Sequence, residues 1–332
     1  MSKPRQAFVC VIVVNHNSGQ FLKTCVEALR RQAFTDFEVI LVDNGSTDKS
    51  LDWAGPLPDN YRLMKNEENL GFSSACNAAA QMTQAEWIAT LDADTCPDAH
   101  WLGNLMKAVG RHPSAVMFGS TLVNAERPDI LDVSSKGYHA FGAPWRGDTG
   151  KPISKALPEG YTFSPSPTAG LFQREVFIKA GGFDERFFCY LEVTDLAYRL
   201  RLMGHVCIQA PDAVVLHLSS ALSGGLYGPF AQFHVFRNRI WIYVKNTPLI
   251  LLLVTFPFFL MTQGALIIRA VIFGFGGAAL KGILAAISGI GPILASRAKI
   301  QSEATAGFMQ IAGAMTWSPI KLITRGSDVR PI

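Results

Sequence analysis

The chain has 332 residues, of which 49% are hydrophobic and 17% charged, and its net charge is +4. This length allows one large domain or two modest ones, with a substantial core. Residues 230–332 carry ten basic and two acidic residues, a charge of +8, which leaves about −4 for residues 1–229. A basic, apolar tail is typical of an anionic membrane surface rather than of nucleic-acid binding, so we expect no nucleic-acid partner.

The six cysteines are scattered and form no CxxC pair, which is typical of free thiols in a reducing compartment. The apolar run at residues 8–14 is too short for the hydrophobic part of a secretory signal peptide. We therefore expect the main part of the chain to lie in the cytosol.

Strand and helix patterns alternate at the start of the chain. Residues 8–14 form an apolar run typical of a buried parallel strand, and apolar residues recur at helical spacing over 21–29. Further strands are predicted at 37–42 and 61–65, and an alanine-rich helix at 73–82. This alternation predicts a doubly wound, mostly parallel sheet.

The stretch WIATLDADT at residues 87–95 is predicted as a buried strand that ends in two carboxylates, Asp92 and Asp94. Residues i and i+2 of a strand point to the same face, so these side chains should project together. Neighbouring carboxylates repel unless a cation lies between them, and a hard divalent ion is the usual one. Ligands of open α/β sheets bind beyond the carboxyl ends of the strands. The alternative is that Asp94 caps a helix beginning near Pro97, with Asp92 solvated.

The middle of the chain contains a long segment, residues 124–167, that is rich in Gly, Pro and Ser and has no clear periodicity. A loop of that length is more often a functional lid or binding loop than a simple connection. The other predicted elements are a helix at 97–109, a strand at 115–123, a strand at 168–172, a helix at 192–203, strands at 205–209 and 213–218, a loop at 219–228 and an aromatic, basic helix at 230–245.

Two apolar segments follow. Residues 248–268 carry no charge and are long enough to cross the hydrocarbon core of a bilayer. Residues 270–296 are also apolar but contain Lys281 and Pro292, and a second span would place Lys281 at membrane depth at a cost on the order of a few kcal/mol. A re-entrant or interfacial hairpin avoids this cost. Two buried helices of a soluble domain are the remaining interpretation. We expect residues 248–296 to bind a membrane.

Five motifs, in this order, resemble the family 2 glycosyltransferases with the GT-A fold, especially bacterial rhamnosyltransferase-like members. They are VVNHNS at 13–18, VDNGSTD at 42–48, NLGF at 69–72 with Asn77, LDAD at 91–94, and GGFDERFF at 181–188 running into EVTDL at 192–196. Each motif alone is weak, but the ordered set is specific. The resemblance covers about residues 8–245. It implies a GT-A domain with a doubly wound mixed sheet at 1–229. The apolar and basic composition predicts a hydrophobic, helical, membrane-associating region at 230–332.

The resemblance implies a nucleoside-diphosphate sugar as donor, linked to dTDP or UDP, with rhamnose as one candidate sugar. Asp43, at the end of a strand, would accept hydrogen bonds from the base or the ribose, and Gly71 would allow close approach of the backbone. The residues that would line the nucleotide are Asn15, Asn17, Asp43, Asn69, Gly71, Asn77 and Asp92. The alternatives are that Asp43 caps a helix at 46–53, and that Asn69, Gly71 and Asn77 only form the transition from a loop to a helix.

Asp92 and Asp94 match the DxD motif of the family, which holds a divalent cation, Mn²⁺ or Mg²⁺, on the sugar diphosphate. The cation would offset the negative charge that builds on the departing nucleoside diphosphate. His217, at the end of an apolar strand, is similar in place to a metal-binding histidine of several relatives, and Mn²⁺ tolerates imidazole. A structural histidine is the alternative.

Inverting members of the family need a carboxylate that removes the proton of the acceptor hydroxyl. The family pattern commonly runs acidic–acidic–x–Asp, and its second acidic position, which often supplies the base, is Val193 here. We expect Glu192 to be the base and Asp195 to order the site or the acceptor. The alternative places Glu192 in the first turn of a helix and pairs Asp195 with Arg199.

The sequence thus predicts an inverting, metal-dependent glycosyltransferase. It would act on a lipid-linked glycan at the cytoplasmic face of the cell membrane, in cell-surface polysaccharide synthesis. A catalytically impaired scaffold that binds nucleotide sugar or glycan in an assembly complex is the alternative, and Val193 motivates it. A nicotinamide-dependent oxidoreductase is excluded because no G-x-G-x-x-G follows the first strand.

Overall fold

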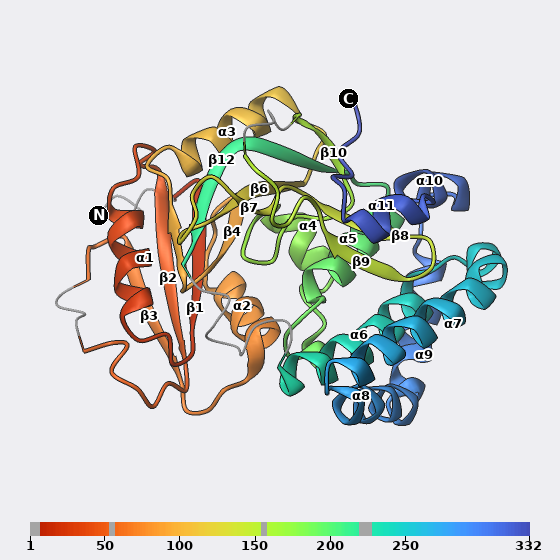
Figure 1. Cartoon of the computed structure of the whole chain (residues 1–332). Helices are drawn as coiled ribbons and strands as arrows, with labels where there is room; N and C mark the ends of the chain where they lie inside the picture. The colour runs from red at the N-terminus through yellow and green to blue at the C-terminus, as the bar shows by residue number, and fades with distance from the viewer. Residues whose placement is uncertain (1–6, 53–56, 154–157, 219–227) are drawn as a thin grey trace.

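A computed structural model describes residues 7–52, 57–153, 158–218 and 228–332. It consists of one large mixed β-sheet with helices on both faces, a separate two-stranded sheet, and a group of C-terminal helices packed beside the large sheet (Figure 1). The predicted loop at 219–228 lies outside the described residues except for its last residue, Gly228.

The sheet has the strand order β10-β12-β6-β11-β4-β1-β2-β3. The strands β1 to β4 run parallel to one another, whereas β11 lies antiparallel between β4 and β6. The sheet is therefore mixed, as the resemblance implied. The bounds are β1 Val9–Asn15, β2 Phe37–Asn44, β3 Tyr61–Asn66, β4 Trp87–Asp92, β6 Met117–Asn124, β10 Gly160–Thr162, β11 Ala169–Gln173 and β12 Cys207–His217.

Alternating residues of the central strands face opposite layers of helices. In β1, Val11 and Val13 pack with the layer of α1 and α3, whereas Cys10 and Ile12 pack with the layer of α2, α4 and α5. The helices are α1 Gln20–Arg30, α2 Gly71–Met82, α3 Trp101–Arg111, α4 Arg174–Lys179 and α5 Glu192–Leu202. Every residue of α5 is buried, because this helix lies between the sheet and the C-terminal helices.

The DxD segment differs from the prediction in its local structure. Strand β4 ends at Asp92, and Ala93 and Asp94 form a turn that leads into a short strand, β5 Thr95–Pro97. The expectation that both carboxylates project from one face of one strand is therefore wrong, as is a helix start near Pro97. The hydroxyl of Thr95 donates to the carbonyl of Asp92 at 2.7 Å and closes the turn. Both carboxylates nevertheless remain at the same edge of the sheet.

Segment 124–167, predicted as a loop, contains short strands. Strand β7 Leu131–Val133 pairs with β6, and β8 Lys136–His139 forms a hairpin with β9 Ala143–Arg146. Strands of three or four residues are too short to give a periodic pattern, which is why the sequence did not indicate them. The two strands predicted at 205–209 and 213–218 are one strand, β12, with a bulge between Ala210 and Val214 that accommodates the proline there.

The C-terminal region is helical, as expected. Helix α7 is long and apolar enough to cross a membrane, and α8 and α9 would make a second such segment with a bend of 60°. The bounds are α6 Pro229–Asn246, α7 Leu249–Ile272, α8 Gly276–Ser288, α9 Ile290–Ser302, α10 Phe308–Ala314 and α11 Pro319–Thr324. The last two helices were not predicted, being short.

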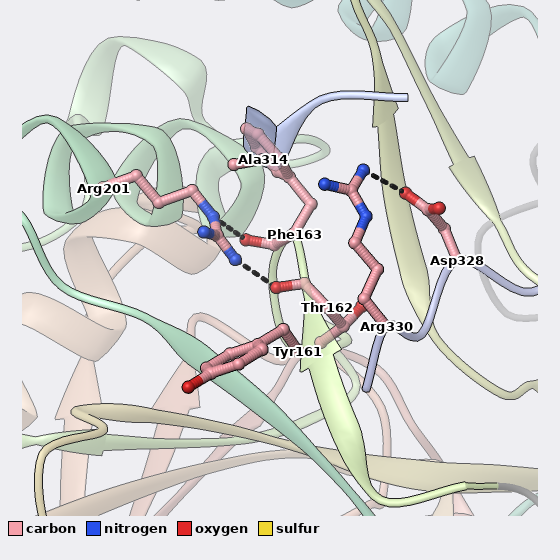
Figure 2. A pocket seen from close by; sticks show the side chains of 7 residues that line it. All are labelled: Tyr161, Thr162, Phe163, Arg201, Ala314, Asp328 and Arg330. Atoms are coloured by element: carbon pink, nitrogen blue, oxygen red, sulfur yellow. Dashed lines mark hydrogen bonds and ion pairs between the residues drawn. The ribbon is translucent and has the colours of Figure 1, made fainter. Parts of the chain in front are cut away.

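The end of the chain returns to the sheet. Arg330 pairs with Tyr161 of β10 through two backbone hydrogen bonds of 2.9 Å, and its side chain reaches Asp328 (Figure 2). In the same figure, Arg201 of α5 donates to the carbonyls of Thr162 and Phe163. The C-terminal residues thus extend the sheet edge and are part of the same folded unit.

Candidate functional site

The carboxyl ends of the parallel strands meet at one edge of the sheet. Asn15 of β1 is in register with Asp43 of β2, and Val14 is in register with Asp92 of β4. The antiparallel pair β5–β12 sets His217 opposite Thr95. The backbone N–H of Leu218 donates to the carbonyl of Asp94 at 2.8 Å, which brings the DxD turn beside the end of β12. Strand register therefore gathers these polar side chains.

The part of this edge where β1 and β2 end is organised by Asn15. Its side-chain amide donates to Asp43 at 3.2 Å and to the hydroxyls of Ser46 and Ser50 at 2.9 Å each. Asn15 is fully buried, and its Oδ1 has no hydrogen-bond partner in the described part of the chain. The described residues after β2, up to residue 52, form turns rather than a helix, so Asp43 caps no helix there. These contacts hold the Asp43 carboxylate at the strand end.

Asn17 and Asn69 brace the loops around this end. Asn17 accepts hydrogen bonds from the backbone N–H groups of Thr47 and Asp48, at 2.8 and 3.2 Å. Asn69 accepts from Asn44 Nδ2 at 2.9 Å. The structure therefore gives both residues a role in shaping the loops at the carboxyl ends of β1 and β2.

Gly71 and Asn77 contact the segment that follows α4. Gly71 has φ +81°, and a Cβ atom there would lie 2.6 Å from the backbone oxygen of Phe188, so the glycine is required for the approach of that residue. Asn77 donates to the carbonyl of Phe183 at 2.8 Å and accepts from its N–H at 2.9 Å. Asn77 also donates to Glu185. Both positions thus fix the 183–188 segment against α2.

His217 lies between two carboxylates. Its Nε2 is 3.4 Å from Asp94, and its Nδ1 is 2.8 Å from Asp132, which also accepts a hydrogen bond from Arg146. Burial opposes protonation of His217, but the hydrogen bonds with Asp132 and Asp94 outweigh it and raise its pKa to about 10. Burial and the neighbouring Asp94 raise the pKa of Asp92 to about 6.

No three His, Cys, Asp or Glu side chains converge as a complete set of metal ligands within the described residues. The donor set nevertheless fits a divalent cation. Asp94 and the Nε2 of His217 face each other, and Asp92 lies at the end of the adjoining strand. Carboxylate oxygens with one imidazole suit Mn²⁺. The other ring nitrogen of His217 is held by a carboxylate, as is usual for metal-ligating histidines.

Glu192 begins α5 and is 3% exposed, and its Oε2 has no partner among the described residues. Burial raises the pKa of this carboxyl to about 7, with Asp92 adding to the shift and Lys136 opposing it. The neighbouring Val193 is buried in the core beside α2. In this chain, the second acidic position of the family pattern is therefore a buried apolar side chain, whereas Glu192 keeps a carboxylate oxygen without a partner among the described residues.

The backbone just before Glu192 is strained. Phe188, Tyr190 and Leu191 have φ of +64°, +66° and +69°, a region that costs non-glycine residues roughly 1–3 kcal/mol each. Asn238 of α6 holds this stretch, because its Nδ2 donates to the carbonyls of Phe187, Cys189 and Tyr190. Backbone strain maintained by tertiary contacts is typical of functional sites. Nothing in the sequence pattern indicated Asn238.

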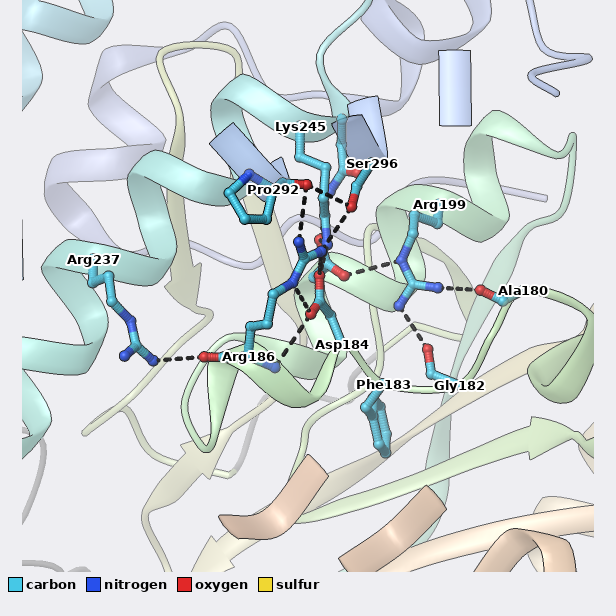
Figure 3. Close-up of polar contacts among 12 residues, drawn as sticks. Ala180, Gly182, Phe183, Asp184, Arg186, Arg199, Arg237, Lys245, Pro292 and Ser296 are labelled. Atoms are coloured by element: carbon cyan, nitrogen blue, oxygen red, sulfur yellow. Dashed lines mark hydrogen bonds and ion pairs between the residues drawn. The ribbon is translucent and has the colours of Figure 1, made fainter. Parts of the chain in front are cut away.

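Asp195 has a different environment from Glu192. It is completely buried, its oxygens accept hydrogen bonds from Arg199 at 3.0 Å and Asn246 at 2.8 Å, and its Oδ1 forms an ion pair with Lys245 at 2.8 Å. Lys245 also contacts Asp184, at 2.5 Å (Figure 3). The predicted alternative, in which Asp195 pairs with Arg199, matches this geometry. Both oxygens of Asp195 are already used inside the fold.

Figure 3 shows how this network continues into the C-terminal helices. Arg186 binds Asp184 at 2.6 Å and reaches across to the carbonyl of Pro292 and the hydroxyl of Ser296, both in α9. The segment that precedes α5 is thus tied to α6 and α9 by charged groups.

Three charged residues near the site were missed in the sequence: Asp132, Lys136 and Arg146. They lie on β7, β8 and β9, and Lys136 is in register with Arg146. Burial and the proximity of Arg146 lower the pKa of Lys136 to about 7. Isolated charges in a segment without periodicity gave no signal of their position.

Comparison with known proteins agrees with the motifs. The family model described as "Glycosyl transferase family 2" matches residues 10–180. A curated relative, the N-acetylglucosaminyl-diphospho-decaprenol L-rhamnosyltransferase of Mycobacterium tuberculosis, is 28% identical over 241 residues, which are 64% of this chain and 77% of the relative. The glycosyltransferase GlyG of Streptococcus pneumoniae is 30% identical over 115 residues, 34% of this chain and 38% of GlyG.

Solved structures share the fold. GalNAc-T7 with UDP, GalNAc and Mn²⁺ has a TM-score of 0.58 at 15% identity, over 73% of this chain and 48% of that one. The mannosyltransferase PcManGT of Pyrobaculum calidifontis, with GDP-Man and Mn²⁺, has a TM-score of 0.54 at 19% identity. The match covers 94% of this chain and 87% of PcManGT. These likenesses support a GT-A-type fold. The family model matches more than half of this chain. The chain therefore belongs to glycosyl transferase family 2 and is a glycosyltransferase.

Proposed function

We propose that the chain is an inverting, metal-dependent glycosyltransferase that moves a sugar from a nucleoside-diphosphate donor to a lipid-linked acceptor. The observation that carries this proposal is the environment of Glu192, which is buried, has an unpartnered oxygen and has a pKa of about 7. Such a pKa suits a general base at neutral pH, because the group is ionised yet still accepts a proton.

In the proposed reaction, the acceptor hydroxyl oxygen attacks the anomeric carbon from the side opposite the donor's phosphate. The bond from that carbon to the phosphate oxygen breaks, and the nucleoside diphosphate leaves with the electron pair. The hydroxyl proton passes to Glu192. Lys136, whose positive charge favours the ionised form of Glu192, lies in β8.

The donor would lie along the sheet edge, with the base or ribose at Asp43 and the diphosphate at the DxD turn. Asn15 supports this placement because it holds Asp43 at the strand end. Asp92, Asp94 and His217 would hold a divalent cation, Mn²⁺ or Mg²⁺, and when bound it supplies electrostatic stabilisation of the departing diphosphate. The presence of Mn²⁺ in the structures of GalNAc-T7 and PcManGT agrees with this assignment.

The donor sugar and acceptor are proposed from the mycobacterial relative, whose name specifies an L-rhamnosyl group and a diphospho-decaprenol-linked N-acetylglucosamine. We propose a dTDP-linked rhamnose donor, with a UDP-sugar as the alternative, and a polyprenyl-diphosphate-linked glycan as acceptor. The product would serve cell-surface polysaccharide synthesis at the cytoplasmic face of the cell membrane.

Residues 230–332 would form the membrane-associating region. One face of α7 packs on the protein through Leu251, Thr255 and Phe259, spaced four residues apart, whereas its other face is apolar and exposed. The ring of Phe258 stacks on Phe141, in the β8–β9 turn, with centroids 4.8 Å apart. A spanning α7 would carry that turn into the bilayer, so we propose that α7 lies along the membrane surface.

A vesicle-binding experiment tests this arrangement. Deletion of residues 248–332 would also remove Arg330, the backbone partner of Tyr161, so single substitutions are cleaner. Met261→Glu in α7 and Ile323→Glu in α11, at positions 70% and 80% exposed, should weaken binding to phosphatidylglycerol vesicles. Leu63→Glu, on the exposed side of β3, is the matched control. Unchanged vesicle binding by both helix variants would contradict the proposed surface.

The catalytic proposal is tested by nucleoside diphosphate release from dTDP-rhamnose, with Mn²⁺ and a polyprenyl-diphosphate-linked acceptor. Glu192→Gln should lower kcat by about 10²–10⁴-fold and leave donor affinity nearly unchanged, because the amide cannot take the proton. Full turnover by this variant would remove Glu192 as the base. An absence of turnover by the unmodified protein across dTDP- and UDP-sugars, with donor binding intact, would favour the scaffold.

A further inference from the structure

Asp132 occupies a fixed position behind His217. It lies in β7, which pairs with β6, and its Oδ2 accepts the hydrogen bond from the Nδ1 of His217 at 2.8 Å. The same oxygen accepts a hydrogen bond from Arg146, on β9. The backbone carbonyl of Asp132 accepts from the hydroxyl of Thr149 at 2.8 Å. Three contacts from two neighbouring segments therefore define where this carboxylate lies.

The two nitrogens of the imidazole ring lie on different edges of it, so Asp132 and Asp94 contact His217 from different sides. The Nε2 atom of His217 faces Asp94 and lies 3.4 Å from its Oδ2. When the Nδ1–H of a neutral ring donates to Asp132, the lone pair is on Nε2 and faces Asp94. Asp132 is thus placed to select the tautomer and the ring orientation that a metal ligand requires.

Arg146 gives Asp132 a permanent positive partner. The hydrogen bond between Asp132 and His217 fixes the orientation of the ring. It also connects the 124–167 segment, whose β7 carries Asp132, to the DxD turn.

We propose that Asp132 is a positioning residue that aims the Nε2 of His217 at the divalent cation held by Asp94, and that Arg146 fixes Asp132 in that position. This inference rests on the proposed metal dependence of the enzyme. It assigns to the 124–167 segment a part in cation binding, in addition to any contact with the acceptor.

Titration with MnCl₂, in the presence of UDP and separately of dTDP, tests the inference, with free Mn²⁺ followed by electron paramagnetic resonance. Asp132→Ala should weaken Mn²⁺ binding by about 10–100-fold, the usual effect of removing a residue that orients a ligand. Asp132→Asn should retain more affinity, because its amide oxygen can accept the same bond. The matched control is Asp148→Ala, which removes a carboxylate that binds Ser134 and Lys151 but not His217.

A double-mutant cycle separates orientation from general structural damage. In a His217→Ala background, Asp132→Ala should cause no further loss of Mn²⁺ affinity, because there is no ring to orient. A purely structural role would give additive losses and would overturn the inference. Circular dichroism checks that each variant is folded. If Asp132→Ala is not folded, the same comparison is made with Asp132→Asn.

The outcomes for the unmodified protein distinguish the two levels of the proposal. If it binds Mn²⁺ with one of the nucleotides and Asp132→Ala binds it equally well, the role of Asp132 is refuted and the metal-dependent function stands. If the unmodified protein binds no Mn²⁺ with either nucleotide, metal dependence fails and the role of Asp132 fails with it.

Discussion

The candidate site is built from two regions that differ in how the chain makes them. The sheet-edge half consists of Asn15, Asp43, Asp92 and Asp94, at or just beyond the ends of β1, β2 and β4. The covering half consists of Asp132, Lys136, Arg146 and Glu192, on β7 to β9 and at the start of α5.

The two halves are stabilised by different forces. In the sheet-edge half, parallel register aligns the strand ends, and nearly all residues of the apolar strands beneath them are buried. In the covering half, side chains are held by hydrogen bonds and ion pairs between distant segments, such as Asp132 to His217, 85 residues apart. Apolar packing thus holds the sheet-edge half in place, and a polar network holds the covering half. The following experiments probe that difference.

The largest effect is expected in the sheet-edge half, from Asp94→Ala. This change removes a proposed metal ligand that lies in a turn, so activity should fall by about 10²–10³-fold or more while thermal unfolding changes little. Nucleoside diphosphate release and a melting curve measure the two effects. Asp98→Ala, an exposed carboxylate just before α3, is the control and should retain activity. Near-full activity of Asp94→Ala would show that the DxD turn holds no essential cation.

In the network that supports the covering half, Lys245→Met should mainly reduce stability. Lys245 is 1% exposed and lies between Asp184 and Asp195, which would lose their shared cation. Breaking one partner of a buried ion pair costs about 3–5 kcal/mol, to be measured as the free energy of unfolding in urea. Lys281→Met, at an exposed position of α8, should change it little. Equal free energies of unfolding for the two variants would show that the ion pairs of Lys245 do not stabilise the fold.

The smallest effect, and the one that links the halves, is the pH dependence set by Glu192. Its pKa is raised to about 7, mainly by burial and also by Asp92, while Lys136 opposes the shift. A general base must be ionised, so kcat should rise with pH and reach half its maximum near pH 7. A rate that is independent of pH between 6 and 8 would argue against this residue.

The same shift has a consequence for stability. A carboxyl whose pKa is higher in the folded state contributes stability below its unfolded value, near 4.5, and that contribution is lost as pH rises through about 7. Glu192→Gln should therefore unfold at a higher temperature than the unmodified protein at pH 8, with a smaller difference at pH 5. Melting curves at the two pH values measure this effect.

The sequence by itself determined the central parallel strands and the polar residues at their carboxyl ends. Apolar strands and amphipathic helices have periods that can be seen along the chain, and strand ends carry their polar residues with them, so β1 to β4, α1, α2 and Asp43, Asp92 and Asp94 were all indicated. The family model and the solved structures bear out the fold and the family.

Only the tertiary structure decided how the remaining residues are used. The turn at Asp94, the short strands that carry Asp132 and Arg146, and the different environments of Glu192 and Asp195 depend on contacts between segments far apart in the chain. The α6 residues Asn238 and Lys245 belong to the same group. Such contacts have no period along the sequence, because their partners are chosen by packing in space.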